Sequence, residues 1–221
     1  MPEISPSYVN FGLNALDNYL DEHASRPHDI LYELYRETHL RTVNPRMLSG
    51  HIQGRFLNLM VTLSKAERIL EIGTFTGYSA ICMAMALPIN GELHTIEIND
   101  ELESISRKYF KKADLENKIH LHIGDACQII STLNGLFDMV FMDGDKMEYE
   151  HYYELCLNKL KPGGLILADN VLWSGKVLET DKEFDKHTFA VDAFNKKITA
   201  DPRVENFILP VRDGIMCITK I

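Results

Sequence analysis

The chain has 221 residues, of which 45% are hydrophobic and 25% charged, and its formal net charge is −9 at pH 7. This composition is that of a globular protein with its own core, and it excludes disorder as the main state. The acidic balance disfavours nucleic acid or an anionic membrane as a partner, because both need clustered positive charge.

The first third of the chain reads as helices. Residues 1–22 lack the basic start and apolar run of a signal peptide, and no stretch approaches the about 20 apolar residues that cross a bilayer. Apolar residues recur at helical spacing around Leu13–Leu20 and Ile30–Tyr35, and a third helix is expected after Ser49. We therefore predict a single domain, 1–221, with N-terminal helices over 1–65 and a sheet core over 66–221.

From Arg68 onward, short β-rich runs alternate with helical stretches. The runs are RILEIG, ELHTIEI, KIHLHIG, FDMVFMDG and GGLILADN. This alternation predicts right-handed βαβ crossovers, and so an α/β fold with a mostly parallel sheet and helices on both faces. The last two runs, VENFILPV and GIMCITKI, are separated only by residues 212–214. They are expected to form an antiparallel hairpin at the sheet edge, giving seven strands.

Small and acidic residues follow the first three predicted strands, where an open α/β sheet binds its ligand. Gly73 and Gly77 allow a tight turn, but their G-x-x-x-G spacing differs from the G-x-G-x-x-G of dinucleotide folds. Glu71 would repel a pyrophosphate, yet it suits the ammonium and sulfonium of S-adenosylmethionine. Glu97 ends the second strand and can accept both ribose hydroxyls, and Gly124–Ala126 can meet an adenine edge.

Five motifs resemble the cation-dependent class I O-methyltransferases, the group of catechol and caffeoyl-CoA O-methyltransferases. They are LEIGTFTGYSA, TIEIN, GDA, FMDGDK and LADNVLWSG, and the similarity runs from about Arg41 to the C-terminus. The resemblance implies the Rossmann-like class I methyltransferase fold, N-terminal helices that cover the acceptor site, and a homodimer. It implies cofactor binding by Ser49, Glu71, Gly73, Thr74, Ser79, Glu97, Ala126 and Asp143.

Three oxygen-bearing side chains follow two neighbouring predicted strands. Asp143 ends the fourth strand and Asp169-Asn170 ends the fifth, and adjacent strands lie about 4.8 Å apart. Two carboxylates and an amide suit Mg²⁺, Ca²⁺ or Mn²⁺ rather than Zn²⁺, and the resemblance places a divalent cation here, with Mg²⁺ preferred. An octahedral ion would keep room for a water and two vicinal substrate oxygens, which predicts a catechol-like diol. Alternatively, these residues only cap turns, with Asp143 capping a helix at Lys146.

The resemblance also implies a catalytic residue and an acceptor pocket. Lys146 matches the family's proposed general base, but its role stays open. Neighbouring carboxylates favour its charged form, whereas a metal ion and a sulfonium favour the neutral base. Trp173 could form a wall against an aromatic substrate, or it could simply pack. Met47 is expected near the methyl-transfer site, and Asp145 is expected to touch the substrate.

The remaining reactive residues are expected to be structural. The four cysteines contain no C-x-x-C pair, which favours reduced thiols and a cytoplasmic protein. The nine histidines are expected to form no ligand cluster, and His120 and His122, on one face of a strand, are expected to be surface or capped positions. Tyr149, Tyr152 and Tyr153 are expected to pack against the sheet.

The sequence thus predicts an O-methyltransferase that uses S-adenosylmethionine and a divalent metal to modify vicinal hydroxyls of a small aromatic molecule. One alternative is methylation of a hydroxylated RNA base, which the net charge disfavours. Another is a non-catalytic protein that binds S-adenosylmethionine, which the presence of Lys146 and the three metal-ligand candidates disfavours. A nicotinamide-dependent reductase is excluded by the glycine spacing and by the absence of a Tyr-x-x-x-Lys motif.

Overall fold

The computed structural model describes residues 13–179 and 184–221. Residues 1–12, which carry most of the stretch read for a signal peptide, lie outside the described residues. Within the described ranges, no helix is both long and apolar enough to span a membrane.

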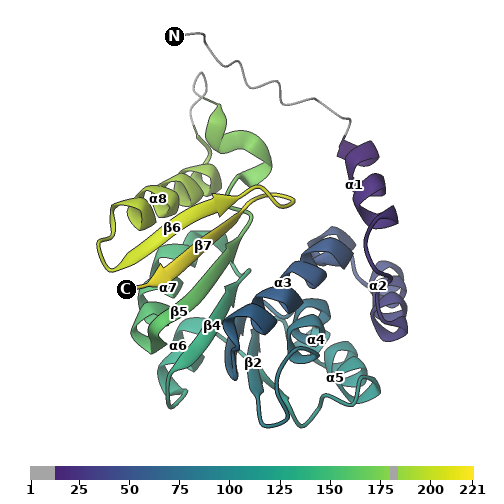
Figure 1. The fold of residues 1–221 in the computed structure, drawn as a ribbon. Coiled ribbons are helices and arrows are strands. Elements are labelled where there is room, and N and C mark those ends of the chain that lie inside the picture. Colours follow the sequence, from purple (N-terminus) through teal and green to yellow (C-terminus); the bar gives the residue numbers. More distant parts are fainter. Residues whose placement is uncertain (1–12, 180–183) are drawn as a thin grey trace.

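A seven-stranded sheet forms the centre of the molecule, in the order β3-β2-β1-β4-β5-β7-β6 (Figure 1). The strands are β1 (Arg68–Ile72), β2 (Glu92–Glu97), β3 (Ile119–Ile123), β4 (Phe137–Met142), β5 (Leu160–Asp169), β6 (Val204–Leu209) and β7 (Ile215–Lys220). The first five pair in parallel, whereas β7 runs antiparallel to both β5 and β6. The mostly parallel sheet with a C-terminal antiparallel hairpin is therefore confirmed.

Helices cover both faces of the sheet (Figure 1). The α-helices are α1 (Leu13–Glu22), α2 (Asp29–Arg41), α3 (Gly50–Ser64), α4 (Tyr78–Ala84), α5 (Glu103–Lys112), α6 (Ala126–Thr132), α7 (Tyr149–Lys159) and α8 (Lys186–Ala200). Short 3-10 helices are η1 (Pro45–Met47), η2 (Asp100–Leu102), η3 (Lys146–Glu148) and η4 (Trp173–Leu178). The three helices expected in the first third of the chain are present, and the third begins directly after Ser49.

Two hydrophobic layers flank the sheet, and strand β4 contributes to both. Met139 and Phe141 pack with α2, α3, α4 and α5, while Val140 and Met142 pack with α6, α7 and α8. All four side chains are fully buried, which explains why the run reads as continuously apolar rather than alternating. Because the central strands run in parallel, the carboxyl ends of β1, β2, β4 and β5 meet at one edge.

Candidate active site

The turn after β1 depends on two glycines with left-handed backbone. Gly73 has φ +96°, and a Cβ there would lie 2.4 Å from the carbonyl oxygen of Asp143. Gly77 has φ +91°, and a Cβ there would lie 2.5 Å from the Phe110 ring. The amides of Gly73 and Thr74 both donate to the carbonyl of Ile96, at 3.0 and 3.2 Å. These hydrogen bonds hold the turn to the end of β2, and the close approach of Gly73 places it against Asp143 at the end of β4.

Glu71 is a fully buried carboxyl group below this turn. The hydroxyls of Ser79 and Thr95 donate to its two oxygens. Burial raises the pKa of Glu71 to about 8; the two hydroxyls counteract the shift, while the carboxylates of Asp143 and Glu97 add to it. A cationic group bound beside Glu71 would therefore favour its charged form. Thr95 was not predicted, although it is the direct register partner of Glu71 on β2.

Glu97 and Ala126 lie at the ends of β2 and β3, as their motifs predict. Glu97 is 8% exposed, and its two carboxylate oxygens accept the amides of Phe75, at 2.7 Å, and Asn99, at 2.9 Å. Ala126 is buried at the first turn of α6, whose N-terminus is capped by Asp125. A carboxylate oxygen has two lone pairs, so Glu97 keeps acceptor capacity for a ligand hydroxyl.

Asp143 and Asp169 follow directly on Met142 and Ala168, which are register partners on β4 and β5. Burial raises the pKa of Asp143 to about 6; Lys146 opposes this shift and the Asp169 carboxylate adds to it. Lys146 is 8% exposed, and its Nζ donates to Asp143 Oδ1 at 2.8 Å and to the Gly144 carbonyl at 3.2 Å. The two acids thus lie at neighbouring strand tips, Asp169 buried and Asp143 partly buried, and Lys146 pairs with Asp143.

Asp169 is held by a chain of polar contacts that the sequence analysis missed. Gln53 Nε2 donates to Asp169 Oδ2 at 2.6 Å, and Arg212 Nη1 donates to Gln53 Oε1 at 2.8 Å. The amide of Asn170 donates to the other carboxylate oxygen at 2.8 Å, and Asn170 itself has φ +58°. Gln53 is fully buried, on the same face of α3 as Leu57. That polar residue in an apolar helical stripe was the signal available in the sequence.

Tyr149 connects the tips of β4 and β5. Its hydroxyl lies 3.0 Å from the carbonyl oxygens of both Met142 and Asp169. Tyr149, Tyr152 and Tyr153 are all buried, so the packing prediction is confirmed. The contact of the Tyr149 hydroxyl with both strand ends is an additional role that the spacing of these tyrosines does not reveal.

The three residues expected to shape the acceptor pocket lie in different settings. Met47 is 57% exposed and borders a small pocket beside the β1 turn. That pocket is lined by Met47, Leu48, Ser49, Gly73, Thr74, Phe75, Tyr78, Ser79 and Asp143. Among the described residues its lining includes neither Asp145 nor Trp173. Asp145 caps η3 by accepting the Met147 amide at 3.0 Å, a capping role that the sequence reading considered for Asp143. The Trp173 ring lies 6.1 Å from the His187 ring.

The donors at the tips of β4 and β5 fit a hard divalent cation. Asp143, Asp169 and Asn170 offer two carboxylates and one amide from neighbouring strand ends, and Mg²⁺, Ca²⁺ and Mn²⁺ prefer such oxygens. The raised pKa of Asp143 reflects burial beside a second acid with too little positive charge. A cation between the two carboxylates would relieve this repulsion.

Comparisons with known proteins point to one family. The family model described as O-methyltransferase matches residues 21–221. A Dictyostelium discoideum protein named "Probable caffeoyl-CoA O-methyltransferase 2" is 34% identical over 213 residues, which cover 94% of this chain and 92% of the relative. A Mus musculus protein named "Catechol O-methyltransferase domain-containing protein 1" is 36% identical, over 94% of this chain and 80% of the relative.

Solved structures agree with these relatives. A SAH-bound methyltransferase of Podospora anserina has a TM-score of 0.88 and 28% identity, covering all of both chains. An O-methyltransferase of Bacillus cereus in complex with SAH has a TM-score of 0.86 and 28% identity, covering 94% of this chain and 97% of the other.

Proposed function

The chain belongs to the O-methyltransferase family, with the class I methyltransferase fold, and on this premise we propose that it transfers a methyl group from S-adenosylmethionine to one of two vicinal hydroxyls of a small aromatic substrate. Two sets of observations support the reaction. The relatives are named for caffeoyl-CoA and catechol O-methylation, and two structural neighbours bind SAH.

One observation carries the proposal: the Gly73 turn leaves no room for a side chain against the backbone of Asp143. The turn is where a methyl donor would bind, and Asp143 is where the cation would bind. Their contact would put the transferred methyl group beside the acceptor oxygen. Holding both reactants in this way can supply about 7–11 kcal/mol of the barrier.

The methyl donor would be bound by residues from several strand ends. We propose Ser49, Glu71, Gly73, Thr74, Ser79, Glu97, Ala126 and Asp143 as its binding residues. When bound, S-adenosylmethionine supplies an activated methyl group on a sulfonium. Buried Glu71 suits the ammonium end, because a cation there stabilises its carboxylate. Glu97, with its remaining lone pairs, suits the ribose hydroxyls.

Asp143, Asp169 and Asn170 would hold the divalent cation, and we propose Mg²⁺ as the ion. When bound, such a cation lowers the pKa of a coordinated hydroxyl and stabilises the resulting oxyanion. Gln53, itself held by Arg212, would keep Asp169 turned toward the ion, since it donates to one of the carboxylate oxygens. Tyr149 would keep the two strand tips at a constant separation.

Lys146 would act on the acceptor oxygen. Its Nζ already donates to Asp143 and to the Gly144 carbonyl, which leaves one N–H of the ammonium free. We propose that this N–H donates to the substrate oxygen as it attacks the methyl carbon in line. The acceptor hydroxyl gives its proton to solvent water; the oxygen–carbon bond forms while the sulfur–carbon bond breaks, and the bonding pair stays on the sulfur, which leaves as a neutral thioether.

Met47, Asp145 and Trp173 are proposed to contact the aromatic acceptor, beneath the N-terminal helices of residues 1–65. Met47 is 57% exposed and Trp173 is half-buried, so a ligand can reach both side chains. We also propose that residues 1–221 act as one domain, in a cytoplasmic homodimer that does not bind nucleic acid.

The test is a methyl-transfer assay with S-adenosylmethionine and Mg²⁺. Caffeoyl-CoA and catechol should be methylated, whereas analogues with a single hydroxyl should react far more slowly because they lose the chelate. EDTA should abolish turnover and added Mg²⁺ restore it, with products identified by mass spectrometry. Turnover only on RNA containing a hydroxylated base, or binding of S-adenosylmethionine without turnover on any acceptor, would contradict the proposal.

A further inference from the structure

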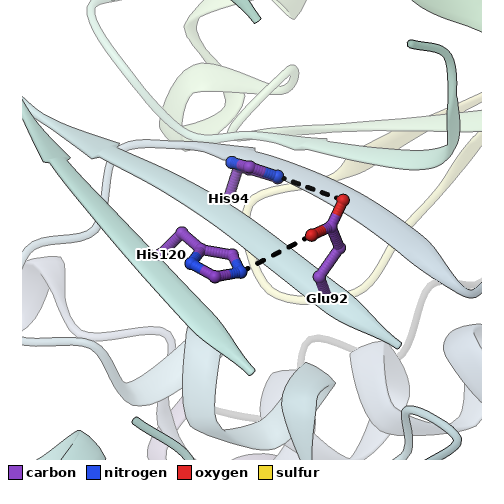
Figure 2. Close-up of side chains that lie close together, drawn as sticks. All are labelled: Glu92, His94 and His120. Atoms are coloured by element: carbon purple, nitrogen blue, oxygen red, sulfur yellow. Dashed lines mark ion pairs between the residues drawn. The ribbon is translucent and has the colours of Figure 1, made fainter. Parts of the chain in front are cut away.

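A second group of potential metal ligands lies at the opposite end of the sheet. Glu92 begins β2, His94 follows two residues later on the same face, and His120 on β3 is the direct register partner of His94. Figure 2 shows the Glu92 carboxylate beside the two imidazole rings, with a dashed line from each of its oxygens to one ring. The expectation that the histidines form no ligand cluster was wrong, because these ligands come from two strands and no local spacing reveals them.

Two distances within this group, each to a different oxygen of Glu92, are close to the separation of ligand atoms in a tetrahedral metal site. His94 Nε2 lies 3.3 Å from Glu92 Oε1, and His120 Nε2 lies 3.5 Å from Glu92 Oε2. Two ligand atoms that are each about 2.1 Å from a tetrahedral ion are separated by about 3.4 Å. The three ligand atoms all lie within 4.8 Å of one another. An ion therefore fits between them after small side-chain movements.

Arg68 and His122 contact two of these ligands, Glu92 and His94. Arg68 Nε donates to Glu92 Oε1, which leaves Oε2 on the side of His120. His94 Nε2 lies 3.3 Å from Arg68 Nη2, a donor, and 3.3 Å from Glu92 Oε1, an acceptor; in the tautomer that accepts from Arg68, this nitrogen presents its lone pair. His94 Nδ1 can then donate to His122 Nε2, at 3.0 Å.

Arg68 would give up only its long contact with His94 when an ion binds. Its Nη1 also donates to the Asn134 carbonyl, and its guanidinium lies over the Phe137 ring at 4.5 Å. These contacts keep the positive charge beside Glu92 without placing it at Oε2. Hydrogen bonds to the outer oxygen of a ligating carboxylate are common in metal sites.

We propose that Glu92, His94 and His120 form a binding site for a divalent transition-metal ion, Zn²⁺ being the best match, that ties edge strand β3 to β2. Two imidazoles and one carboxylate suit Zn²⁺, whereas the oxygen set at the other end of the sheet suits Mg²⁺. The side chains of Glu92 and His120 are 38% and 43% exposed, so an ion can enter from solvent and keep a water as its fourth ligand. The site is independent of the proposed function.

A third group of potential metal ligands could also bind the ion, so the experiment must remove its contribution. Cys127, Glu148 and His151 also lie close together, with Cys127 Sγ 3.6 Å and Glu148 Oε2 3.7 Å from His151 Nδ1. A thiolate there could bind Zn²⁺ by itself. The experiment therefore uses the full chain with Cys127→Ser, in millimolar Mg²⁺ to occupy the oxygen site.

Zn²⁺ is titrated into this protein by calorimetry, and we expect one ion per chain. His120→Gln should weaken its affinity at least about 10-fold, and Glu92→Gln should do the same. His39→Gln, at an exposed histidine on α2, should leave the affinity unchanged and is the matched control. Zn²⁺ at 100 times its Kd should raise the midpoint of thermal unfolding by about 5–10 °C, and at the same Zn²⁺ concentration His120→Gln should reduce this rise by about half or more.

Unfolding curves without Zn²⁺ establish that each variant folds, and anomalous diffraction at the zinc edge locates the ion. Density between Glu92, His94 and His120 would support the proposal. The absence of Zn²⁺ binding, equal affinity in His120→Gln, or zinc located only at Asp143 and Asp169 would each overturn it.

Discussion

The two ends of strand β4 carry the same pair of residue types, but the pKa of the aspartate is shifted in opposite directions. At the amino end, burial raises the pKa of Asp138, but hydrogen bonds from Lys161 and from the amides of Glu67 and Arg68 outweigh it and leave the pKa lowered. At the carboxyl end, Asp143 also pairs with a lysine, Lys146, yet its pKa is raised to about 6. One aspartate is fully compensated and the other is not.

The difference shows at which end of β4 the negative charge of the acids is not compensated by neighbouring cations. Asp143 lies beside buried Asp169, and buried Glu71 adds a third acid whose pKa is raised to about 8. Burying acids without enough cations lowers stability, and functional sites commonly carry this cost. The carboxyl end of β4 is therefore suited to a cationic methyl donor and a metal ion, whereas Asp138 at its amino end is already paired with Lys161.

The largest effect is expected from Asp169→Ala, which removes one of the two acids. Turnover should fall by at least about 10²–10³-fold, because the metal's stabilisation of the oxyanion is worth several kcal/mol. The measurement is kcat across a Mg²⁺ titration. Asp192→Ala, which breaks an exposed ion pair with Lys196 on α8, is the control and should stay near wild type. An active Asp169→Ala enzyme that EDTA still inhibits would contradict the metal assignment.

Lys146→Met compared with Lys161→Met tests the two ends of β4 directly. Lys146→Met should lower kcat about 10²-fold while affinity for S-adenosylmethionine, measured by calorimetry, changes little. Lys161 is 46% exposed at its side chain, so Lys161→Met should leave kcat unchanged and cost at most about 1 kcal/mol of stability. Equal effects of the two substitutions on kcat would remove the distinction between the ends.

Glu71→Gln should weaken S-adenosylmethionine binding about 10-fold or more, since a charged partner is lost. In the wild type the Glu71 carboxyl is protonated below pH 8, so affinity should rise from pH 6 to pH 8; in the variant it should stay flat. The ligand-free variant should also be more stable than wild type at pH 8–9. Because the pKa of Glu71 is raised in the folded state, its contribution to the free energy of unfolding is fully present below pH 4.5 and is lost as the pH rises through 8.

The smallest effect concerns metal affinity below neutral pH. Because the pKa of Asp143 is raised to about 6, protons should compete with Mg²⁺ there, and the apparent affinity should fall several-fold between pH 7 and pH 5.5. Calorimetric titration of Mg²⁺ at both pH values measures this. A pH-independent affinity would mean that Asp143 is not a ligand.

Much of the site could be read from the sequence because its residues follow strand ends in chain order. Glu71, Gly73 and Asp143 each occupy a short motif whose backbone conformation is locally determined, and parallel strands bring such ends to one edge. The roles given to these residues in binding and catalysis stay predictions. The O-methyltransferase family and the fold are confirmed.

The residues that the sequence analysis missed act across long separations. Gln53 reaches Asp169 from α3, Arg212 reaches Gln53 from the hairpin turn, and Thr95 reaches Glu71 only through strand register. Likewise His94 and His120 meet only because β2 and β3 pair in one register. Such contacts depend on packing, which no local pattern encodes.

The sequence by itself determined the alternation of strands and helices, the glycine turn and the order of acids along it, since periodicity and backbone conformation are local properties. Only the tertiary structure decided which acids share one buried volume and which are neutralised, because burial and charge pairing depend on neighbours that are distant in the chain.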